Sequence, residues 1–493
     1  MRKILFLLFF IVACTFSYGQ KSNPKSRIPG QYIVIMTDKF SPPLSRRPLN
    51  SFRDRRANQQ AAGLLRKNTR DSVLHYARRK MNGIDTTVVK VFVDVLVGFR
   101  VSGLSESDRA ALENDKINIR AVIPDFKVKL APSADEMNTL NIGTQTTPIF
   151  QTLTAQTTPI FQSTPIFQTT PIFQTTPIFQ SGSQINTTPI FQTTTDADPN
   201  AIIFKYSDLD PRTRETIAVQ KAGGAKDNSL DSNAIWFLDT GIDSLHPDLN
   251  VVKDLCKSFA AGELTRIKDY NGHGTHCAGI AAARGANTIG VTGVAAGAKV
   301  IAVKVLDSTG NGSWSSILQG LDYVAQYGLP GDVVNLSLGD YDTTNNESTV
   351  PPLTDAIKAL AAKKLFISMS AGNSAGLAKY NLPGLINGTG IYTTAALTRD
   401  TLSNADLVDY RYSNINDVKG SPVDVVSVGT HVLSTWPGTF NAGRYIPGYR
   451  ILSGTSMASA VTAGALFANK GKIDSSRLVN LNNISYGIIK WVQ

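Results

Sequence analysis

The chain has 493 residues, more than one ordinary domain needs, and its 42% hydrophobic content is normal for a globular protein with a large core. The net charge of +11 is unevenly distributed. Residues 1–140 contain 24 Lys and Arg against 12 Asp and Glu, whereas residues 141–493 contain 25 against 26. Because the second part is nearly neutral, the overall basicity does not indicate a nucleic-acid-binding protein, and we expect no nucleic acid partner.

Residues 1–20 are predicted to be a signal peptide. A charged start precedes the apolar run Ile4–Ala13, which is too short to span a bilayer, and small residues suited to cleavage follow, so that we expect the cut near Gly19 or Gln20. A second interpretation is a bacterial lipobox ending at Cys14, whose lipidation would attach the protein to a membrane. Both interpretations imply export, either as a secreted protein or as a cell-surface lipoprotein.

Residues 28–131 are predicted to form a small α+β domain. The expected order of elements, β-α-β-β-α-β, is typical of an open-faced sandwich of the ferredoxin-like type. The helix over Ser105–Asn114 begins with a serine and early acidic residues, as helix N-termini do. The other expected elements are strands at Gln31–Met36, Lys90–Val101 and Asn118–Lys129 and a basic, partly helical segment at Ser51–Lys80.

Residues 141–195 carry no charge and contain an internal repeat. The hexapeptide TTPIFQ begins at Thr146, Thr157, Thr169, Thr175 and Thr187, and the variant STPIFQ begins at Ser163. Because the proline of each unit cannot donate to a strand ladder, extended or polyproline structure is expected. The segment is interpreted as a low-complexity linker; the alternative is an adhesive segment that presents Ile and Phe in each unit.

Residues 201–493 are predicted to form an α/β domain, because apolar strands alternate with helices. The strands end at Asp239, near Leu306, at Ser337 and at Ser370, and helices are expected over Ser315–Tyr327 and Thr354–Lys363. This alternation predicts a mostly parallel sheet covered by helices on both faces. Functional side chains of such folds gather at the carboxyl ends of the strands.

Ser456 lies in the segment Ser453–Ala460, which opens a run of small and apolar residues that predicts a tightly packed, buried helix. A serine in the first helical turn stands beside free backbone N–H groups that can hold an oxyanion. An ordinary serine hydroxyl is a weak nucleophile, so it needs a general base and a group that orients that base.

Two upstream stretches supply these groups. His273 stands between glycines at the start of another small-residue helix, and Asp239 ends an apolar strand. The three stretches, in the order Asp, His, Ser, resemble the signatures of the subtilisin-like serine proteases (subtilases, peptidase family S8), whose triad has this order along the chain. Residues 28–131 resemble the I9-type inhibitor propeptide of that family.

The resemblance implies a subtilisin-like three-layer fold with a mostly parallel sheet over residues 201–493. It also implies a secreted serine endopeptidase that acts on protein or peptide substrates and is made as an autoprocessed zymogen. Its own propeptide would act as a folding aid and intramolecular inhibitor, and the maturation cut is expected between Lys129 and Gln145.

The resemblance also implies roles for individual residues where the motifs of this sequence match those of the family. Ser456 would be the nucleophile, His273 the general base and Asp239 its orienting group, with the amide of Asn373 completing the oxyanion hole. No acidic residue occurs within the expected pocket walls, although Asp340 follows, so an apolar or broad P1 preference is expected. The residues expected to bind substrate are Gly310, Asn311 and Gly312 on one edge, Ser337, Leu338 and Gly339 on the other, and Ser370, Ala371 and Gly372 in the S1 wall.

A structural calcium site is also implied by the resemblance. Asn287, Ile289 and Val291 match the calcium loop of the family, and Asp248 would add a carboxylate suited to a hard cation. The loop is slightly longer than the family pattern, and the alternative is that Asp248 is a turn residue.

Several features remain open at this level. Ala460 and Val461 replace a Pro and a His of the family pattern, and the tail after Ser456 is short, which favours altered helix packing or low activity. Cys256 and Cys277 could form a disulfide, but two buried thiols are preferred. The rival functions are a catalytically impaired subtilase-like binding protein and a surface lipoprotein with a narrow processing task.

Overall fold

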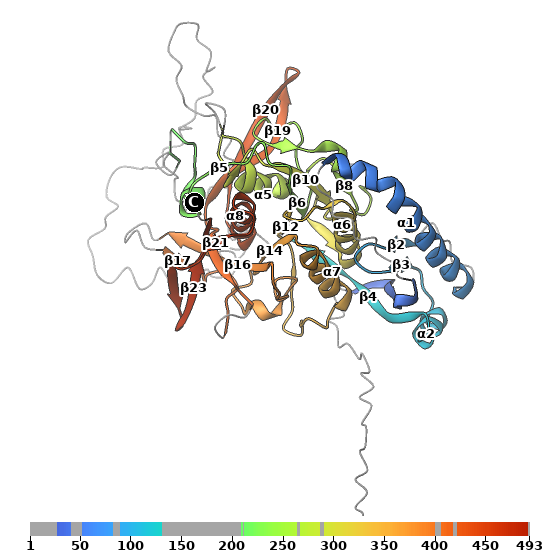
Figure 1. Cartoon of the computed structure of the whole chain (residues 1–493). Helices are drawn as coiled ribbons and strands as arrows, with labels where there is room; N and C mark the ends of the chain where they lie inside the picture. Colours follow the sequence, from blue (N-terminus) through green and yellow to red (C-terminus); the bar gives the residue numbers. More distant parts are fainter. Residues whose placement is uncertain are drawn as a thin grey trace, which may run out of the picture.

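The structure, a computed structural model, describes residues 27–40, 52–81, 89–130, 209–210, 212–263, 267–285, 290–399, 406–417 and 422–491. A small N-terminal domain packs against a larger α/β domain (Figure 1). The predicted signal peptide and the TTPIFQ repeats lie outside the described residues. Within the described part of the chain, no helix combines the length and apolar character that crossing a membrane requires.

The N-terminal domain is a four-stranded antiparallel sheet with the order β4-β1-β3-β2, and α1 and α2 pack against it. This arrangement confirms the predicted α+β ferredoxin-like domain. The single strand expected over Lys90–Val101 is two strands, because the chain turns between them. The elements are β1 (Arg27–Met36), η1 (Asp38–Phe40), α1 (Phe52–Lys80), β2 (Lys90–Phe92), β3 (Gly98–Ser102), α2 (Glu106–Asn114) and β4 (Ile119–Lys129).

The larger domain is built on one mostly parallel sheet with the order β22-β23-β18-β16-β14-β12-β6-β10-β7. The helices are α4 (Ile217–Lys221), α5 (His273–Ala282), α6 (Trp314–Tyr327), α7 (Pro351–Ala362) and α8 (Thr455–Ala468), with short turns η4 (Lys253–Leu255) and η5 (Ala378–Tyr380). The strands up to the middle of the domain are β5 (Lys226–Asp227), β6 (Ala234–Asp239), β7 (Asn250–Val251), β8 (Lys257–Ser258), β9 (Ala295–Ala296), β10 (Lys299–Lys304), β11 (Asn311–Ser313), β12 (Val333–Leu336), β13 (Asp340–Tyr341), β14 (Phe366–Ser370) and β15 (Asn381–Leu382). The later strands are β16 (Ile391–Arg399), β17 (Asp406–Val408), β18 (Val425–Val428), β19 (Val432–Asn441), β20 (Arg444–Leu452), β21 (Ile473–Asp474), β22 (Leu478–Leu481), β23 (Ile484–Ile488) and β24 (Lys490–Trp491).

Helices cover both faces of this sheet, which confirms the predicted three-layer fold. Successive side chains of β6 point to opposite faces. Trp236 and Leu238 pack in the hydrophobic cluster that contains residues of α6 and α7, whereas Phe237 packs in the cluster that contains residues of α5 and α8. Because β6 is covered on both sides, every one of its residues is buried, and its sequence is continuously apolar up to Asp239.

Glycine allows α5 and α8 to approach each other and their neighbours closely. A Cβ added to Gly464 of α8 would lie 2.8 Å from Cβ of Val294 and 3.0 Å from the carbonyl oxygen of Ala281 on α5. A Cβ added to Gly279 of α5 would lie 2.2 Å from Oγ1 of Thr435 on β19. The small residues of both helices are therefore required by the packing, as their sequences suggested.

The C-terminal part contains elements that the sequence did not predict. The hairpin of β19 and β20 projects from the domain (Figure 1) and leads directly into α8. After α8, the short tail returns to the sheet, where β23 pairs with β18 and β22 pairs with β23. α8 itself runs without a break through Ala460 and Val461, and all of its residues are buried. The departures from the family pattern therefore do not interrupt this helix.

A matched pair of glycine substitutions tests the helix contact. Gly464→Ala should destabilise the protein by about 1–3 kcal/mol, because the added methyl group overpacks the space between α8, Val294 and Ala281. Gly63→Ala on α1 adds the same methyl group where, among the described residues and apart from its own helix backbone, no atom lies within 4 Å, so it should be neutral or stabilise by up to about 1 kcal/mol. Chemical unfolding measures both; equal effects of the two substitutions would contradict the proposed packing constraint.

Candidate active site

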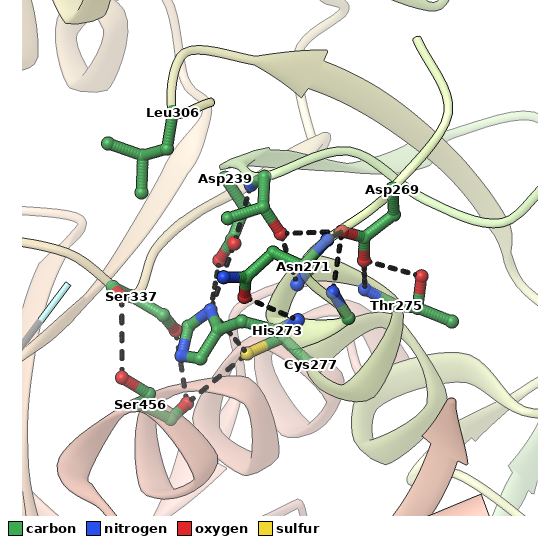
Figure 2. Close-up of polar contacts among 12 residues, drawn as sticks. Asp239, Asp269, Asn271, His273, Thr275, Cys277, Leu306, Ser337 and Ser456 are labelled. Atoms are coloured by element: carbon green, nitrogen blue, oxygen red, sulfur yellow. Dashed lines mark hydrogen bonds and ion pairs between the residues drawn. The ribbon is translucent and has the colours of Figure 1, made fainter. Parts of the chain in front are cut away.

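Asp239 and His273 are held together at the carboxyl end of the sheet. Asp239 is the last residue of β6 and is fully buried, and His273 is the first residue of α5. The His273 Nδ1–H group donates to both carboxylate oxygens of Asp239 at 2.9 Å (Figure 2). Because a carboxylate is an acceptor, this contact places the proton on Nδ1 and leaves Nε2 as the proton-accepting nitrogen.

The loop before α5 is organised by a second buried carboxylate, that of Asp269. Its Oδ1 accepts from the amides of Asn271 and Gly272 and from the Thr240 hydroxyl, and its Oδ2 accepts from the amide and hydroxyl of Thr275 (Figure 2). Burial raises the pKa of Asp269, and the hydrogen bonds from Gly272 and Thr275 act in the opposite direction. Asp269 thus joins the strand end at Thr240 to the first turn of α5.

Ser456 stands in the first turn of α8, close to His273 (Figure 2). Its hydroxyl donates to the carbonyl oxygen of Ser337 at 3.3 Å, and the Ser337 hydroxyl donates to the carbonyl oxygen of Ser456 at 3.0 Å. The Cys277 sulfur lies 3.9 Å from both His273 Nδ1 and the Ser456 carbonyl oxygen. The three predicted side chains therefore share one site, with the Ser456 hydroxyl turned toward Ser337.

The charge of Asp239 dominates the electrostatics of His273. Burial alone lowers the pKa of His273, but the negative charge of Asp239 and the hydrogen bond to it raise the pKa well above the ordinary 6.5. The Cys277 thiol, whose own pKa is raised by burial, acts in the same direction on His273 but less strongly than the charge of Asp239. The imidazolium is therefore stabilised mainly by Asp239.

Asn373 lies next to Ser456 in the fold. Its Oδ1 accepts from the amide of Thr455 at 2.9 Å and from the Thr455 hydroxyl at 2.8 Å. These contacts fix the orientation of the side-chain amide, and its Nδ2 lies so close to Gly454 that a Cβ there would be 3.2 Å from it. Nδ2 thus lies near the N-terminus of α8, where backbone N–H groups have no partner within the helix.

Two of the predicted substrate-binding edges enclose a segment of the N-terminal domain. β11, which contains Asn311 and Gly312, pairs antiparallel with the end of β4, and Lys129 also forms a bridge with Gly339. The Leu130 amide donates to the carbonyl oxygen of Gly310 at 2.9 Å. The groove between the two edges therefore binds an extended chain by strand pairing, and residues 127–130 occupy it.

The predicted pocket wall at Ser370–Gly372 is buried and connected to α8, the helix that carries Ser456. The Gly372 amide donates to Oγ1 of Thr455, and the Ala371 carbonyl oxygen accepts from Asn414. Gly372 has φ of +96°, and a Cβ there would lie 2.4 Å from Nδ2 of Asn414, so only glycine fits at this turn. Leu338 of the opposite edge is buried in the core.

The described part of the predicted calcium site fits a calcium ion poorly. Asn287 and Ile289 lie outside the described residues. Asp248 is fully buried, but its Oδ2 already accepts from the Tyr449 hydroxyl at 2.8 Å and from the Val291 amide at 3.3 Å. Calcium needs six to eight oxygen ligands, and these protein donors compete for the carboxylate that should contribute most.

Sequence reasoning missed several groups that shape the site. Three groups are recognisable only from contacts between distant segments: the Asp269 carboxylate, the Ser337 hydroxyl, which bonds to the Ser456 carbonyl, and Thr455, which orients Asn373. The one local signal was the position of Asp269 shortly before His273. Cys256 and Cys277 are both unpaired, as preferred from the sequence, although Cys256 is only partly buried.

Comparison with known proteins places these observations in context. Residues 234–480 match the family model described as the subtilase family. Subtilisin Savinase from Lederbergia lenta is 37% identical over 249 residues, which are 50% of this chain and 80% of that protein. Alkaline protease from Alkalihalobacillus alcalophilus is 37% identical over 50% of this chain and 57% of its own length, and thermitase from Thermoactinomyces vulgaris is 34% identical over 50% and 79%. The matched region contains Asp239, His273, Asn373 and Ser456.

The effect of Asp239 on His273 can be measured by NMR titration of the imidazole groups. We expect His273 to titrate with a pKa above 6.5, and Asp239→Asn to lower that pKa by about 1–3 pH units because the stabilising charge is lost. His276 serves as the internal control, since burial lowers its pKa to about 3 and keeps it neutral throughout. A His273 pKa that is unchanged in Asp239→Asn would contradict this account.

Proposed function

Because this chain belongs to the subtilase family and is a serine endopeptidase, we propose that it hydrolyses peptide bonds through Asp239, His273 and Ser456 and is made as a zymogen. The proposal rests chiefly on one observation, the contact of His273 with the buried Asp239 carboxylate beside Ser456. This contact leaves His273 Nε2 able to accept a proton from the serine hydroxyl.

The reaction begins when the Ser456 hydroxyl rotates from the Ser337 carbonyl toward His273 Nε2. Hydrogen bonds of this kind are often long before substrate binds, so the observed rotamer is compatible with activity. Ser456 Oγ then attacks the scissile carbonyl carbon while its proton moves to Nε2. The imidazolium, stabilised by Asp239, returns the proton to the leaving amine, and water repeats the sequence on the acyl-enzyme.

The oxyanion that forms during attack is bound by two N–H donors. The Ser456 amide belongs to the first turn of α8, where it has no partner within the helix, and Asn373 Nδ2 is oriented by the bonds of its own Oδ1 to Thr455. Each such donor typically contributes about 3–4 kcal/mol to transition-state stabilisation. The tight turn at Gly372 brings Asn373 to this position.

The zymogen proposal rests on strand pairing in the groove. Lys127–Lys129 pair with β11, and Leu130 bonds to Gly310, so the end of the N-terminal domain binds as an extended substrate would. A second chain cannot pair with the same edges at the same time. The N-terminal domain therefore acts as an intramolecular inhibitor, and the maturation cut falls between Lys129 and Gln145, as predicted from the sequence.

The groove also suggests the substrate preference. Val128 is buried in the core cluster that includes Trp314 and Leu338, whereas the flanking Lys127 and Lys129 are exposed. Together with the neutral wall at Ser370–Gly372, this favours peptides with apolar side chains in the enclosed positions. Residues 1–20 would export the enzyme, and the lipid-anchored form through Cys14 remains the alternative location.

Removing the nucleophile tests the proposal. Ser456→Ala should lower kcat for a peptide amide by about 10⁴-fold or more and should leave the chain uncut beyond the signal peptide. Ser374→Ala is the matched control, because Ser374 is exposed beside Asn373 and should change kcat little. Mass spectrometry of the purified chains and a serine-directed fluorophosphonate label provide the measurements. Conversion to a shorter chain in Ser456→Ala would count against self-processing.

Two carboxylates, those of the buried Asp125 and the partly buried Asp322, join the two domains along α6. Asp125 of β4 accepts from the Ser315 amide at the start of α6, and Asp322 of α6 accepts from the amides of Val93, Asp94 and Val95. Burial, with a smaller effect from the charge of Asp94, raises the pKa of Asp322 to about 7. Arg66 and Lys363 are the cations that face Asp94 here.

This arrangement predicts that docking of the N-terminal domain weakens with rising pH. Because the docked state raises the pKa of Asp322 above its ordinary value, docking is strongest when the group is protonated in both states and weakens as pH rises from that ordinary value to about 7. Protection factors from hydrogen exchange at residues 89–102 of Ser456→Ala should therefore fall by up to about tenfold per pH unit between roughly pH 4 and about 7, and should level off above about 7. Asp322→Asn should remove the pH dependence, whereas Asp355→Asn, at the exposed pair with Arg120, should keep it; an equal fall in both variants would refute the assignment.

A further inference from the structure

The loop where the family resemblance implied a calcium ion is bound by an arginine. Arg214 precedes α4 and is buried, with only 9% of its surface exposed to solvent. Its Nε and Nη2 donate to the carbonyl oxygen of Gly290 at 3.0 and 2.7 Å. Gly290 immediately precedes Val291, one of the predicted calcium ligands, so a guanidinium cation contacts the backbone of that loop.

The same place contains the carboxylate predicted to bind calcium. Gly290 is so close to Asp248 that a Cβ there would lie 2.2 Å from Asp248 Oδ2, and this oxygen bonds to the Val291 amide. Both charged groups affect the pKa of Tyr449. Burial and the charge of Asp248 raise this pKa, whereas the charge of Arg214 lowers it. The buried negative charge of Asp248 therefore has a buried positive charge near it without a metal ion.

The backbone directs Arg214 into this position. The Arg214 amide donates to the carbonyl oxygen of Asp210, which closes a tight turn, and Arg214 has φ of +59°, in the left-handed region. The Arg214 carbonyl oxygen accepts from the Thr292 amide, and the Thr292 hydroxyl donates to the Thr213 carbonyl. The turn is thus fixed to the end of the loop, with Arg214 pointing inward and the side chain of Arg212 90% exposed.

We propose that the guanidinium of Arg214 takes the structural place of a calcium ion at this loop, so that the stability of the protein does not depend on calcium. A guanidinium offers several fixed donors and stays charged at all relevant pH values, so it can hold a carbonyl oxygen and balance a carboxylate as a cation would. The family resemblance predicts that calcium stabilises the protein, whereas this inference predicts that calcium has no effect on its stability, so one experiment distinguishes them.

The experiment measures thermal unfolding of the full chain carrying Ser456→Ala, which prevents self-digestion. We expect the same Tm, within about 1 °C, in excess EDTA and in millimolar CaCl₂, and no calcium-binding heat by titration calorimetry. Arg214→Met should lower the Tm by about 3–6 °C in EDTA, because it leaves Asp248 buried without its cation. Arg212→Met, which removes an exposed arginine two residues away, should leave the Tm unchanged.

Two results would overturn the inference. One is a calcium-dependent rise in Tm in the chain that retains Arg214, abolished by Asp248→Asn, because the loop would then be a metal site. The other is an Arg214→Met chain that melts like its parent. A calcium-dependent rise confined to Arg214→Met would support the inference, because removal of the guanidinium would then admit a metal cation. None of these measurements depends on peptidase activity, so the proposed function is tested separately.

Discussion

The close contact between α5 and α8 is the constraint on which the rest of the active site depends. His273 opens one of these helices and Ser456 lies in the first turn of the other, so the distance between the two helices sets the distance between the proposed base and the proposed nucleophile. Glycine at position 464 of α8 permits this spacing, because a larger residue would meet Ala281 of α5, and Gly279 of α5 allows the same close approach to β19. The parallel sheet then adds Asp239 at the end of β6, which lies between β12 and β10.

Much of this arrangement could be predicted because the relevant signals are local. The apolar run that ends at Asp239 is continuous, since both faces of β6 are covered, and such a strand is recognisable without any knowledge of its neighbours. The small-residue helices after His273 and Ser456 are equally visible. Parallel topology then implies that strand ends meet at one edge of the sheet, which places Asp239 and Asn373 on the same side.

Other parts of the site could not be predicted because their meaning depends on partners far away in the chain. Asp269 reads as a loop residue until its five donors are known, and Arg214 reads as a surface cation of a polar turn. β19 and β20 were missed because Pro437 and the glycines at 438 and 448 interrupt the strand pattern, and their pairing shifts in register at this point. Proline and glycine favour turns, so they hid the strand pattern in the sequence, and the same residues lie at the bulge in the hairpin.

β4 has a consequence of its own, because it joins strands of both domains into one five-stranded sheet. One edge pairs with β1 inside the N-terminal domain, and its last residues pair with β11 of the larger domain. The hydrogen bonds that join β4 to β1 and β11 do not require the peptide bond after residue 130 to be intact. Severing the chain after residue 130 would therefore leave a non-covalent complex, from which the freed fragment must still dissociate or be digested. The rate at which active enzyme appears would then depend on the lifetime of that complex. Before the cut, inhibition is independent of protein concentration, whereas after the cut it would follow the binding equilibrium between two separate molecules.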